Sequence, residues 1–313
     1  MKHFELVEPA TLDEAVALLD PEDAGVRAIA GGTALMLMMK ARLFQPVRLV
    51  SLRRLNGVLR GVRENERGGL TIGAMTTLRE LERSPQVAAA VPVMSRAMRM
   101  LSNVRIRNVA TIGGHLAHGD PHMDLPPILI TLGARVRAVS RRGERWIDIA
   151  DLFTGYYQVA VARDELITEV EVPAQPPGVH TWYAKFAALS ADDWPSVGVA
   201  VWFRTASGAV SATTSGNIAE ARISEARIAV SAATERPVRV AGAEGALVGA
   251  PATPETFAAA AAEAAEAAAE EIDPLADIRG SAAYKREMVR VHTRRALAQA
   301  WHGAASPTTT EAD

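Results

Sequence analysis

A glycine pair between a short apolar segment and a helical stretch constrains this chain more than any other local feature. The segment Val26–Ala30 is followed by Gly31-Gly32, and a helical stretch runs from Leu35 to about Arg42. Glycines let backbone N–H groups approach an anion without an intervening Cβ, and a helix start adds a partial positive charge. The pattern therefore predicts a strand, a loop and a helix that bind a phosphate or diphosphate. The alternative is an ordinary tight turn, because Gly-Gly pairs are common at turns.

A second glycine pair favours the binding interpretation over the turn. The segment Thr111-Ile112-Gly113-Gly114-His115 repeats the arrangement of a small residue, an apolar residue and two glycines. Two such loops from distant parts of one domain can hold both ends of a diphosphate. Neither loop has the G-x-G-x-x-G spacing of a Rossmann fold or the G-K-[ST] of a P-loop, so those nucleotide-binding folds are excluded.

The second pair runs into a cluster of histidine and aspartate. Three histidines and two aspartates stand within ten residues: His115, His118, Asp120, His122 and Asp124. Such side chains are metal ligands in proteins. The spacing is irregular, however, and no H-E-x-x-H pattern fixes two ligands on one helix. We therefore predict no metal site and no catalytic residue on this chain, and we keep the metal as an alternative.

Composition limits the class of protein. The 313 residues are 49% hydrophobic and 22% charged, which is ordinary for a globular protein of two domains. The net charge of −2 gives no general attraction to nucleic acid or anionic membranes. The chain has no cysteine, so it holds neither disulfides nor cysteine-ligated iron–sulfur clusters. We expect a cytoplasmic protein, because no apolar run approaches the roughly 20 residues of a membrane span and no signal peptide is recognisable.

Hydrophobic patterning predicts an α+β protein with two domains. The first domain, residues 1–177, is expected to contain two α+β subdomains. Its first helix begins with a T-x-x-E capping box at Thr11 and Glu14. Its last strand is Leu166–Val172, and a proline-rich linker follows. Further strands and helices are expected at 47–52, 70–74, 77–83 and 93–104. Arg105 and Arg107 are expected to face solvent, with an acidic partner as the alternative.

The second domain, residues 178–302, is expected to contain a three-stranded sheet followed by helices. The predicted strands are Gly198–Phe203, Val210–Thr213 and Ala226–Ser231. One helix begins at Thr253-Pro254, a cap and a first-turn proline, and runs to about Glu271. Another is expected from about Ser281 to Ala300, and residues 303–313 are expected to be a disordered tail.

The two glycine elements together resemble the FAD-binding subunits of the molybdenum hydroxylases, the xanthine dehydrogenase and carbon monoxide dehydrogenase family. The motifs are A-G-G-T-A-L, T-I-G-G-H and L-A-H-G-D-P-x-x-D-L-P. The similarity covers nearly the whole chain, from the opening F-E-L-V-E-P-A-T-L-D-E-A through L-T-I-G-A-M-T-T to Asp277–Tyr284 and Arg294-Arg295-Ala296. The combination is far more specific than any one motif, and it implies an FAD-binding domain of the PCMH type.

The resemblance implies that this chain binds FAD through both glycine elements and several other residues. Asp124 matches an acidic FAD ligand, and Lys185 matches a lysine near the flavin ring, where a cation suits the charge of reduced flavin. Trp194 lies in a loop that approaches the flavin in the family. The alternatives are a surface lysine and a tryptophan packed in a core or interface. The implied cofactor-binding residues are Gly31, Gly32, Thr33, Ala34, Leu35, Leu101, Thr111, Ile112, Gly113, Gly114, His115, Asp124, Ile167, Lys185 and Trp194.

Three positions depart from the family pattern. Thr33 and Ala34 stand where Gln or His and then Ser are usual, and Ala34 cannot donate a hydroxyl hydrogen bond to a phosphate. His115 replaces a more usual Asn or Ser and can still form a hydrogen bond with a cofactor. All three changes leave the glycine framework intact.

The resemblance also implies partner chains. A large molybdopterin-binding subunit would oxidise the substrate, and a small iron–sulfur subunit would pass electrons to the FAD, in a dimer of heterotrimers. The FAD would then reduce an external acceptor. The absence of cysteine fits this division, since the clusters must lie on another chain. Two alternatives are a stand-alone flavin oxidase and a non-catalytic flavin-binding assembly module. The substrate, whether carbon monoxide, an aldehyde or an N-heterocycle, would be chosen by residues on another chain.

Overall fold

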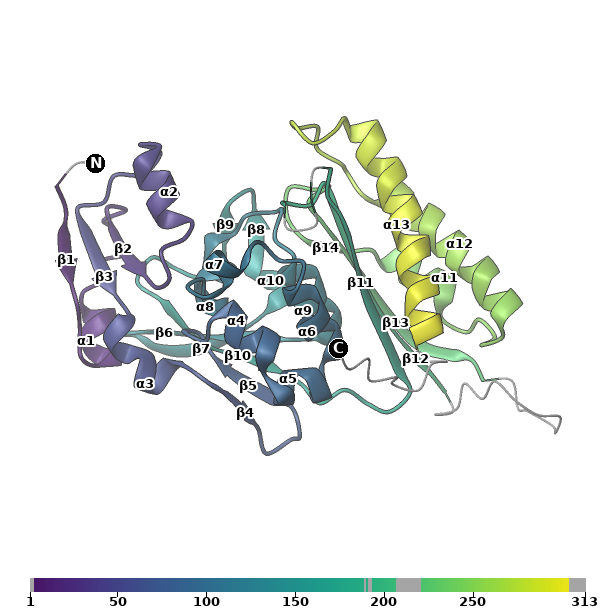
Figure 1. The fold of residues 1–313 in the computed structure, drawn as a ribbon, viewed down its shortest axis with the longest axis horizontal. Helices are drawn as coiled ribbons and strands as arrows, with labels where there is room; N and C mark the ends of the chain where they lie inside the picture. Colours follow the sequence, from purple (N-terminus) through teal and green to yellow (C-terminus); the bar gives the residue numbers. More distant parts are fainter. Residues whose placement is uncertain (1–2, 189, 191–192, 207–220, 304–313) are drawn as a thin grey trace. The chain divides into compact units, whose positions relative to one another are not determined.

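The computed structural model of the chain describes residues 3–188, 190, 193–206 and 221–303, and it divides into two compact units (Figure 1). Unit 1 comprises Met1–Asp120 and Gly133–Ala174, and unit 2 comprises Pro121–Leu132 and Gln175–Asp313. The chain therefore enters unit 2 for one short segment and returns to unit 1. That segment contains helix α9, Leu125–Leu132, in which every residue is buried. A helix that is apolar on all sides needs protein around it.

The first sheet of unit 1 is parallel, and one of its strands leads into the first glycine pair. Its strands are ordered β1-β3-β2. The predicted strand, glycine pair and helix are confirmed, because β2 leads directly through Gly31-Gly32 into α2. Helix α1 is capped by the Thr11 hydroxyl, which accepts from the Glu14 N–H at 3.1 Å. The Glu14 carboxylate accepts from the Ala10 N–H rather than that of Thr11. The elements are β1 Glu5–Val7, α1 Leu12–Ala17, β2 Val26–Ile29, α2 Leu35–Lys40 and β3 Arg48–Ser51.

The second sheet of unit 1 has five antiparallel strands in the order β4-β5-β10-β6-β7. The predicted strands at 70–74 and 166–172 are confirmed as β5 and β10. Strand β6 alternates between buried and half-buried residues, as period-two patterning requires. A two-stranded ribbon, β8 and β9, follows. The bounds are β4 Val62–Glu64, β5 Leu70–Gly73, β6 Arg135–Ser140, β7 Gly143–Asp148, α10 Ile149–Leu152, β8 Phe153–Gly155, β9 Gln158–Val159 and β10 Leu166–Val172.

Short helices of unit 1 follow β3 and β5 in the chain. The helix expected over 93–104 is wrong in its extent, because the chain breaks between α6 and α7 at Ser102, whose φ is 54°. The expectation that Arg107 faces solvent is also wrong. Its side chain is buried, with Nε 2.9 Å from a Glu82 carboxylate oxygen and Nη1 3.2 Å from the Leu101 carbonyl. The helices are η1 Arg53–Leu55, α3 Asn56–Leu59, α4 Leu78–Arg83, α5 Pro85–Ala90, α6 Pro92–Met98, α7 Val104–Arg107 and α8 Ile112–His118.

Unit 2 is built on a four-stranded antiparallel sheet in the order β11-β12-β13-β14, so the predicted three-stranded sheet is wrong. The predicted strands Gly198–Phe203 and Ala226–Ser231 lie within β12 and β13. The predicted strand Val210–Thr213 lies outside the described residues. Strands β11 and β14 were not predicted, because β11 lacks a regular alternation of buried residues and β14 is very short. The bounds are β11 Val179–Phe186, β12 Val197–Thr205, β13 Ile223–Ser231 and β14 Val238–Arg239.

Helices cover both faces of the unit 2 sheet. On one face, α11, α12 and α13 pack over the strands (Figure 1), and Trp301 stacks on Phe257 with ring centroids 4.4 Å apart. On the other face, Arg227 of β13 donates to the Thr131 carbonyl of α9 at 3.1 Å. Both helices predicted from the C-terminal sequence are confirmed. Within the described residues, no helix is long and apolar enough to cross a membrane. The bounds are α11 Ala241–Leu247, α12 Pro254–Glu271 and α13 Ala282–Gly303.

Candidate functional site

The two glycine elements lie side by side in unit 1. A Cβ added to Gly31 would stand 2.1 Å from the Val109 carbonyl oxygen and 3.0 Å from the Ala110 Cα. A Cβ added to Gly114 would stand 3.7 Å from the Cβ of Ala30. No side chain fits at Gly31, because its neighbour there is backbone. The structure thus brings together the two segments that the diphosphate interpretation requires.

The first glycine element leaves its backbone N–H groups without protein acceptors. Gly32 adopts φ +69°, a conformation that favours glycine, and its carbonyl accepts from the Met36 N–H at 2.9 Å. Helix α2 has Ala34 at its N-cap and therefore no side-chain cap. Among the described residues, no hydrogen bond engages the N–H of Gly31, Gly32, Thr33, Ala34 or Leu35. This half-buried loop can offer donors to an anion.

The second glycine element is the first turn of helix α8 rather than an open loop. The Thr111 hydroxyl accepts from the Gly114 N–H at 3.2 Å, and the Thr111 carbonyl accepts from the His115 N–H at 2.8 Å. The Gly113 N–H donates to the Ala74 carbonyl at 2.9 Å. These bonds occupy the donors that we expected the second element to present. The backbone of Gly113, Gly114 and His115 therefore leaves open space beside the first element rather than free N–H donors.

The two glycines of α8 have different reasons to be glycine. A Cβ on Gly113 would stand 2.6 Å from the Ala74 Cβ, so Gly113 is required for the helix to pack beside β5. Gly114 is exposed, and the nearest atom to an added Cβ is the Thr111 hydroxyl at 3.0 Å. Gly113 is explained by packing alone. Gly114 leaves a face without a side chain beside the free donors of the first element.

His115 follows the glycine pair and presents an unpaired ring nitrogen. Its Nε2 is shielded from solvent and has no hydrogen-bond partner among the described residues. Burial and, to a smaller extent, the nearby His118 lower the pKa of His115 to about 3, while Asp120 opposes the shift. The imidazole is therefore neutral near pH 7. A buried polar atom without a partner is uncommon, and a ligand is one explanation.

The remaining site residues that we predicted in unit 1 are apolar and buried. Leu101 lies just after α6 and is 5% exposed. Ile167 lies on β10 and is 6% exposed. Strand β10 packs against α8, so Ile167 stands on the strand beside the second glycine element.

The histidine and aspartate cluster is divided between the two units. His118 and Asp120 belong to unit 1, where the Tyr157 hydroxyl donates to Asp120 at 2.6 Å and His118 lies edge-on to the Tyr157 ring. His122 and Asp124 belong to unit 2 and are bound to other partners. Among the described residues, no three His, Asp or Glu side chains are arranged to hold a metal ion.

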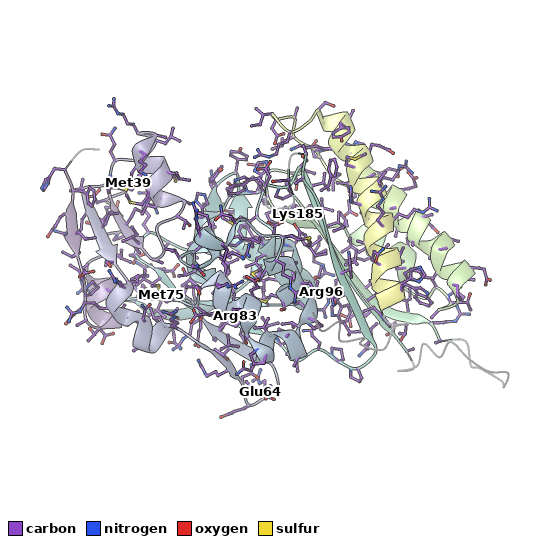
Figure 2. The ribbon with its side chains drawn as sticks, viewed as in Figure 1. Met39, Glu64, Met75, Arg83, Arg96 and Lys185 are labelled. Atoms are coloured by element: carbon purple, nitrogen blue, oxygen red, sulfur yellow. The ribbon has the colours of Figure 1, made fainter. Side chains whose placement is uncertain are left out.

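Asp124 and Lys185 form a buried ion pair in unit 2. The Lys185 Nζ is 3.3 Å from the Asp124 Oδ2, and the two side chains are 3% and 7% exposed. The Tyr183 hydroxyl donates to the Asp124 Oδ1 at 2.7 Å. Lys185, labelled in Figure 2, is therefore not an ordinary surface lysine. Sequence reasoning singled out both residues but did not predict that they touch.

The surroundings of Asp124 alter its acidity. Burial raises the pKa of Asp124 to about 6, although the Lys185 charge and the Tyr183 hydroxyl act to lower it. Burial and the adjacent Asp124 raise the pKa of Tyr183 well above its usual value. Asp124 is thus a carboxylate at pH 7 and takes up a proton near pH 6.

Trp194 is a partly exposed aromatic in unit 2. Its side chain is not buried in a core, since the residue is 43% exposed. Its ring lies edge-on to the His122 ring, with centroids 6.5 Å apart. This placement disfavours core packing as the reason for the tryptophan.

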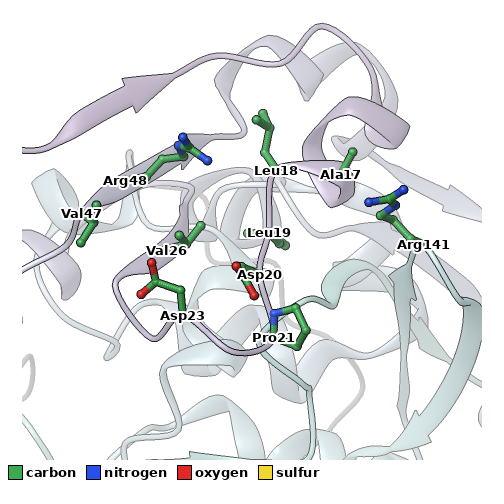
Figure 3. Close-up of a pocket in the computed structure, with 10 residues that line it drawn as sticks. All are labelled: Ala17, Leu18, Leu19, Asp20, Pro21, Asp23, Val26, Val47, Arg48 and Arg141. Carbon is green, nitrogen blue, oxygen red and sulfur yellow. The ribbon is translucent and has the colours of Figure 1, made fainter.

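A separate pocket in unit 1 was not predicted from the sequence. It encloses about 440 Å³ and mixes acidic with basic side chains, Asp20, Asp23, Arg48 and Arg141 among them (Figure 3). Two of these are already engaged, because Asp23 accepts from the Gly25 N–H and Arg48 pairs with Glu5. No residue of either glycine element lines this pocket, so it is distinct from the candidate site.

Comparison with known proteins identifies the family of both parts of the chain. Residues 2–175 match the FAD-binding domain of molybdopterin dehydrogenases, and residues 182–300 match the C-terminal domain of the CO dehydrogenase flavoprotein. The medium subunit of nicotine 6-hydroxylase from Paenarthrobacter nicotinovorans is 36% identical, over 93% of this chain and 95% of that one. The carbon monoxide dehydrogenase medium chain of Hydrogenophaga pseudoflava is 35% identical, over 95% of this chain and 97% of that one.

Solved structures agree with the sequence comparison. A carbon monoxide dehydrogenase from Hydrogenophaga pseudoflava, which lacks the Mo-pyranopterin moiety of its cofactor, superposes with a TM-score of 0.85 at 34% identity. The match covers 96% of this chain and 98% of that one. The chain therefore belongs to the family of FAD-binding subunits of molybdopterin-dependent dehydrogenases, the molybdenum hydroxylases.

Proposed function

We propose that this chain carries noncovalent FAD and passes electrons from the iron–sulfur clusters of a partner chain to an external acceptor. The observation that carries the proposal is the first glycine element. Its N–H groups have no acceptor among the residues that the structure describes, and it lies beside Gly114, which has no side chain. In a member of this family, that cradle is assigned to the diphosphate of FAD.

The residues of unit 1 fit the chemistry of a diphosphate. Donors from Gly31 through Leu35 supply hydrogen bonds that need no side chain, so the alanine at position 34 is tolerated. The unpaired Nε2 of His115 adds a polar atom that hydrogen bonds to the cofactor. Gly114 provides room for the phosphate oxygens, while Leu101 and Ile167 provide apolar surface.

The residues of unit 2 fit a redox partner that gains negative charge. When bound, FAD supplies a centre that accepts and donates one or two electrons. The Lys185 side chain is already held in place by Asp124. Little further ordering of its ammonium is therefore needed when the flavin gains negative charge. Asp124 holds a proton at its carboxylate only below a pH of about 6. Trp194, exposed at the surface of unit 2, is assigned to shield the flavin from water.

The division of labour among subunits follows from the composition and the relatives. The chain has no cysteine, so iron–sulfur clusters belong on a small partner subunit, and the molybdopterin belongs on a large one. Relatives are described as medium subunits or medium chains. We propose a dimer of heterotrimers, with the domain boundary of this chain near residue 177. The relatives differ in substrate, nicotine and carbon monoxide among them, which agrees with substrate choice by another chain.

The test is to purify this chain together with a large molybdopterin-binding subunit and a small iron–sulfur subunit from the same organism, and to measure flavin content and electron transfer. About one FAD per copy of this chain is expected, with dye reduction that stops when the FAD is removed and resumes when it is restored. A complex without flavin contradicts the proposal. Substrate oxidation by the isolated chain would instead favour a stand-alone flavin oxidase, and FAD without electron transfer in any complex would favour an assembly module.

A further inference from the structure

A second buried lysine of unit 2 joins four segments of the chain. The Nζ of Lys285, at the start of α13, donates to the Ala232 carbonyl at 2.9 Å and to the Asp277 carboxylate at 2.7 Å. Its side chain is 1% exposed. The same Asp277 oxygen lies 3.0 Å from the Nε2 of His122. The N–H of Ala232 donates to the Pro121 carbonyl at 2.9 Å.

These contacts fasten one end of the segment Pro121–Asp124. Lys285 binds Ala232 and Asp277, and each of those two residues binds the segment, at Pro121 and His122. The other end of the segment is Asp124, which is held by Tyr183 and Lys185. Four consecutive residues are thus fixed at both ends by polar contacts inside unit 2.

The charged groups of this network have hydrogen-bonding partners that compensate their burial. An isolated buried ammonium is costly, but Lys285 has a carbonyl and a carboxylate as acceptors. Burial alone would raise the pKa of Asp277, whereas hydrogen bonds from Lys285 and His122 lower it to about 2. Removal of one partner from such a group leaves the other charge uncompensated, so the arrangement is sensitive to substitution.

Two candidate flavin residues adjoin this network. Asp124 stands two positions after His122, and the Trp194 ring lies edge-on to the His122 ring. The His122 ring is therefore bonded to Asp277 through Nε2 and meets Trp194 at its edge. No motif or spacing linked Lys285 to Asp124, because the contacts run through Asp277, Ala232 and the 121–122 backbone.

We propose that Lys285 is a positioning residue for the flavin-binding part of unit 2, which acts through Asp277 and His122 to place Asp124 against Lys185 and to support Trp194. The inference rests on the proposed function, since it assigns the network a role toward FAD. Lys285 itself touches neither the cofactor nor the acceptor in this scheme.

The central experiment compares Lys285→Met with a matched neighbour. Methionine keeps an unbranched side chain as far as Cε and removes the ammonium. Arg286→Met is the control, because Arg286 is the next residue of α13 and binds the Ala269 carbonyl of α12 instead. With the full-length chain, we expect Lys285→Met to weaken FAD binding by about tenfold and to shift the flavin midpoint potential, as loss of an orienting partner does at metal sites. Lys285→Arg restores both, and Arg286→Met changes neither.

Two further measurements separate positioning from general damage. In an Asp124→Asn background, Lys285→Met should add little to the loss of FAD affinity, because the two changes act on one element. Without FAD, hydrogen exchange in residues 121–124 should rise in Lys285→Met but not in Arg286→Met. If Lys285→Met does not fold, Asp277→Asn and His122→Gln test the same chain of contacts.

The outcomes distinguish this inference from the proposed function. Wild-type chain that binds no FAD contradicts the proposed function. Wild-type chain that binds FAD, together with Lys285→Met that binds it equally well, overturns only the positioning role. Losses that match those of Arg286→Met at equal stability, or that are additive with Asp124→Asn, overturn it as well.

Discussion

Replacement of Gly114 by valine tests whether the second glycine element belongs to a cofactor site or is only a helix start. The residue is exposed in the first turn of α8, and its Cβ would meet only the Thr111 hydroxyl at 3.0 Å and Ala30 at 3.7 Å. Valine is no worse than glycine as a helix former. The cost to the cofactor-free protein is therefore confined to the Thr111 cap, which contributes about 1 kcal/mol.

The cost to FAD binding is expected to be larger. If phosphate oxygens occupy the space beside Gly114, a valine must displace them or move the helix, and overpacking of this kind costs about 1–3 kcal/mol. Since about 1.4 kcal/mol corresponds to a factor of ten, the Kd for FAD should rise by roughly 5- to 150-fold. The same substitution at Gly113 is expected to unfold unit 1, because its Cβ would stand 2.6 Å from the Ala74 Cβ.

Calorimetric titration of the apo chain with FAD, together with its thermal unfolding, separates these effects. The control is Gly57→Val in α3, a helical glycine of unit 1 with nothing within 4 Å of an added Cβ. We expect Gly114→Val to bind FAD weakly with a Tm close to that of the wild type, and Gly57→Val to bind FAD normally. Equal Kd values for Gly114→Val and wild type would refute the assignment of the second element.

Other expectations concern the cofactor, the isolated chain and pH. Acid precipitation of the complex should release the yellow flavin into the supernatant, and flavin that stays in the pellet would indicate a covalent bond. The isolated chain should oxidise no organic substrate and contain no stoichiometric metal, yet should reduce a dye from artificially reduced flavin; tightly bound metal with turnover would contradict this. The Asp124 carboxyl has a folded pKa of about 6, raised by burial from 3.8. The folded chain therefore binds the extra proton, and the stability of wild type relative to Asp124→Asn should fall as pH rises from about 4 to 6, by at most roughly 3 kcal/mol. Urea unfolding at several pH values measures this, and parallel curves for the two proteins would disprove it.

The parts of the fold that sequence predicted are those with a local signal. Thr11 caps α1 and Thr253 caps α12, because an N-cap hydroxyl needs only the amide three residues ahead. The strand before Gly31 and the helix after Gly32 were likewise predicted from the residues next to the glycine pair. Such contacts join residues a few positions apart, so they can be predicted from the local sequence.

The parts that sequence missed depend on contacts between distant residues. Asp124 and Lys185 are 61 positions apart, and the sequence around each of them does not indicate that they form an ion pair. The assignment of α9 to unit 2 was missed because the sequence of a buried apolar helix does not indicate which sheet it packs against. Strand β11 was missed because its residues do not alternate between buried and exposed. Arg107 was assigned to solvent because its partner, Glu82, lies on another helix.

The two glycine pairs look alike in sequence, yet the residue at each helix start gives them opposite roles. Thr111 is the N-cap of α8, and its hydroxyl takes the Gly114 N–H, so that helix start is satisfied by its own chain. Ala34 is the N-cap of α2 and has no side-chain acceptor, so the preceding donors stay available. A serine at position 34 could accept from the first turn of α2 as Thr111 does in α8. The alanine that departs from the family pattern therefore removes a hydroxyl donor but also a competitor for the same backbone amides. In the proposed FAD site, we therefore expect the uncapped start of α2 to donate hydrogen bonds to the diphosphate and the capped start of α8 to leave room for it.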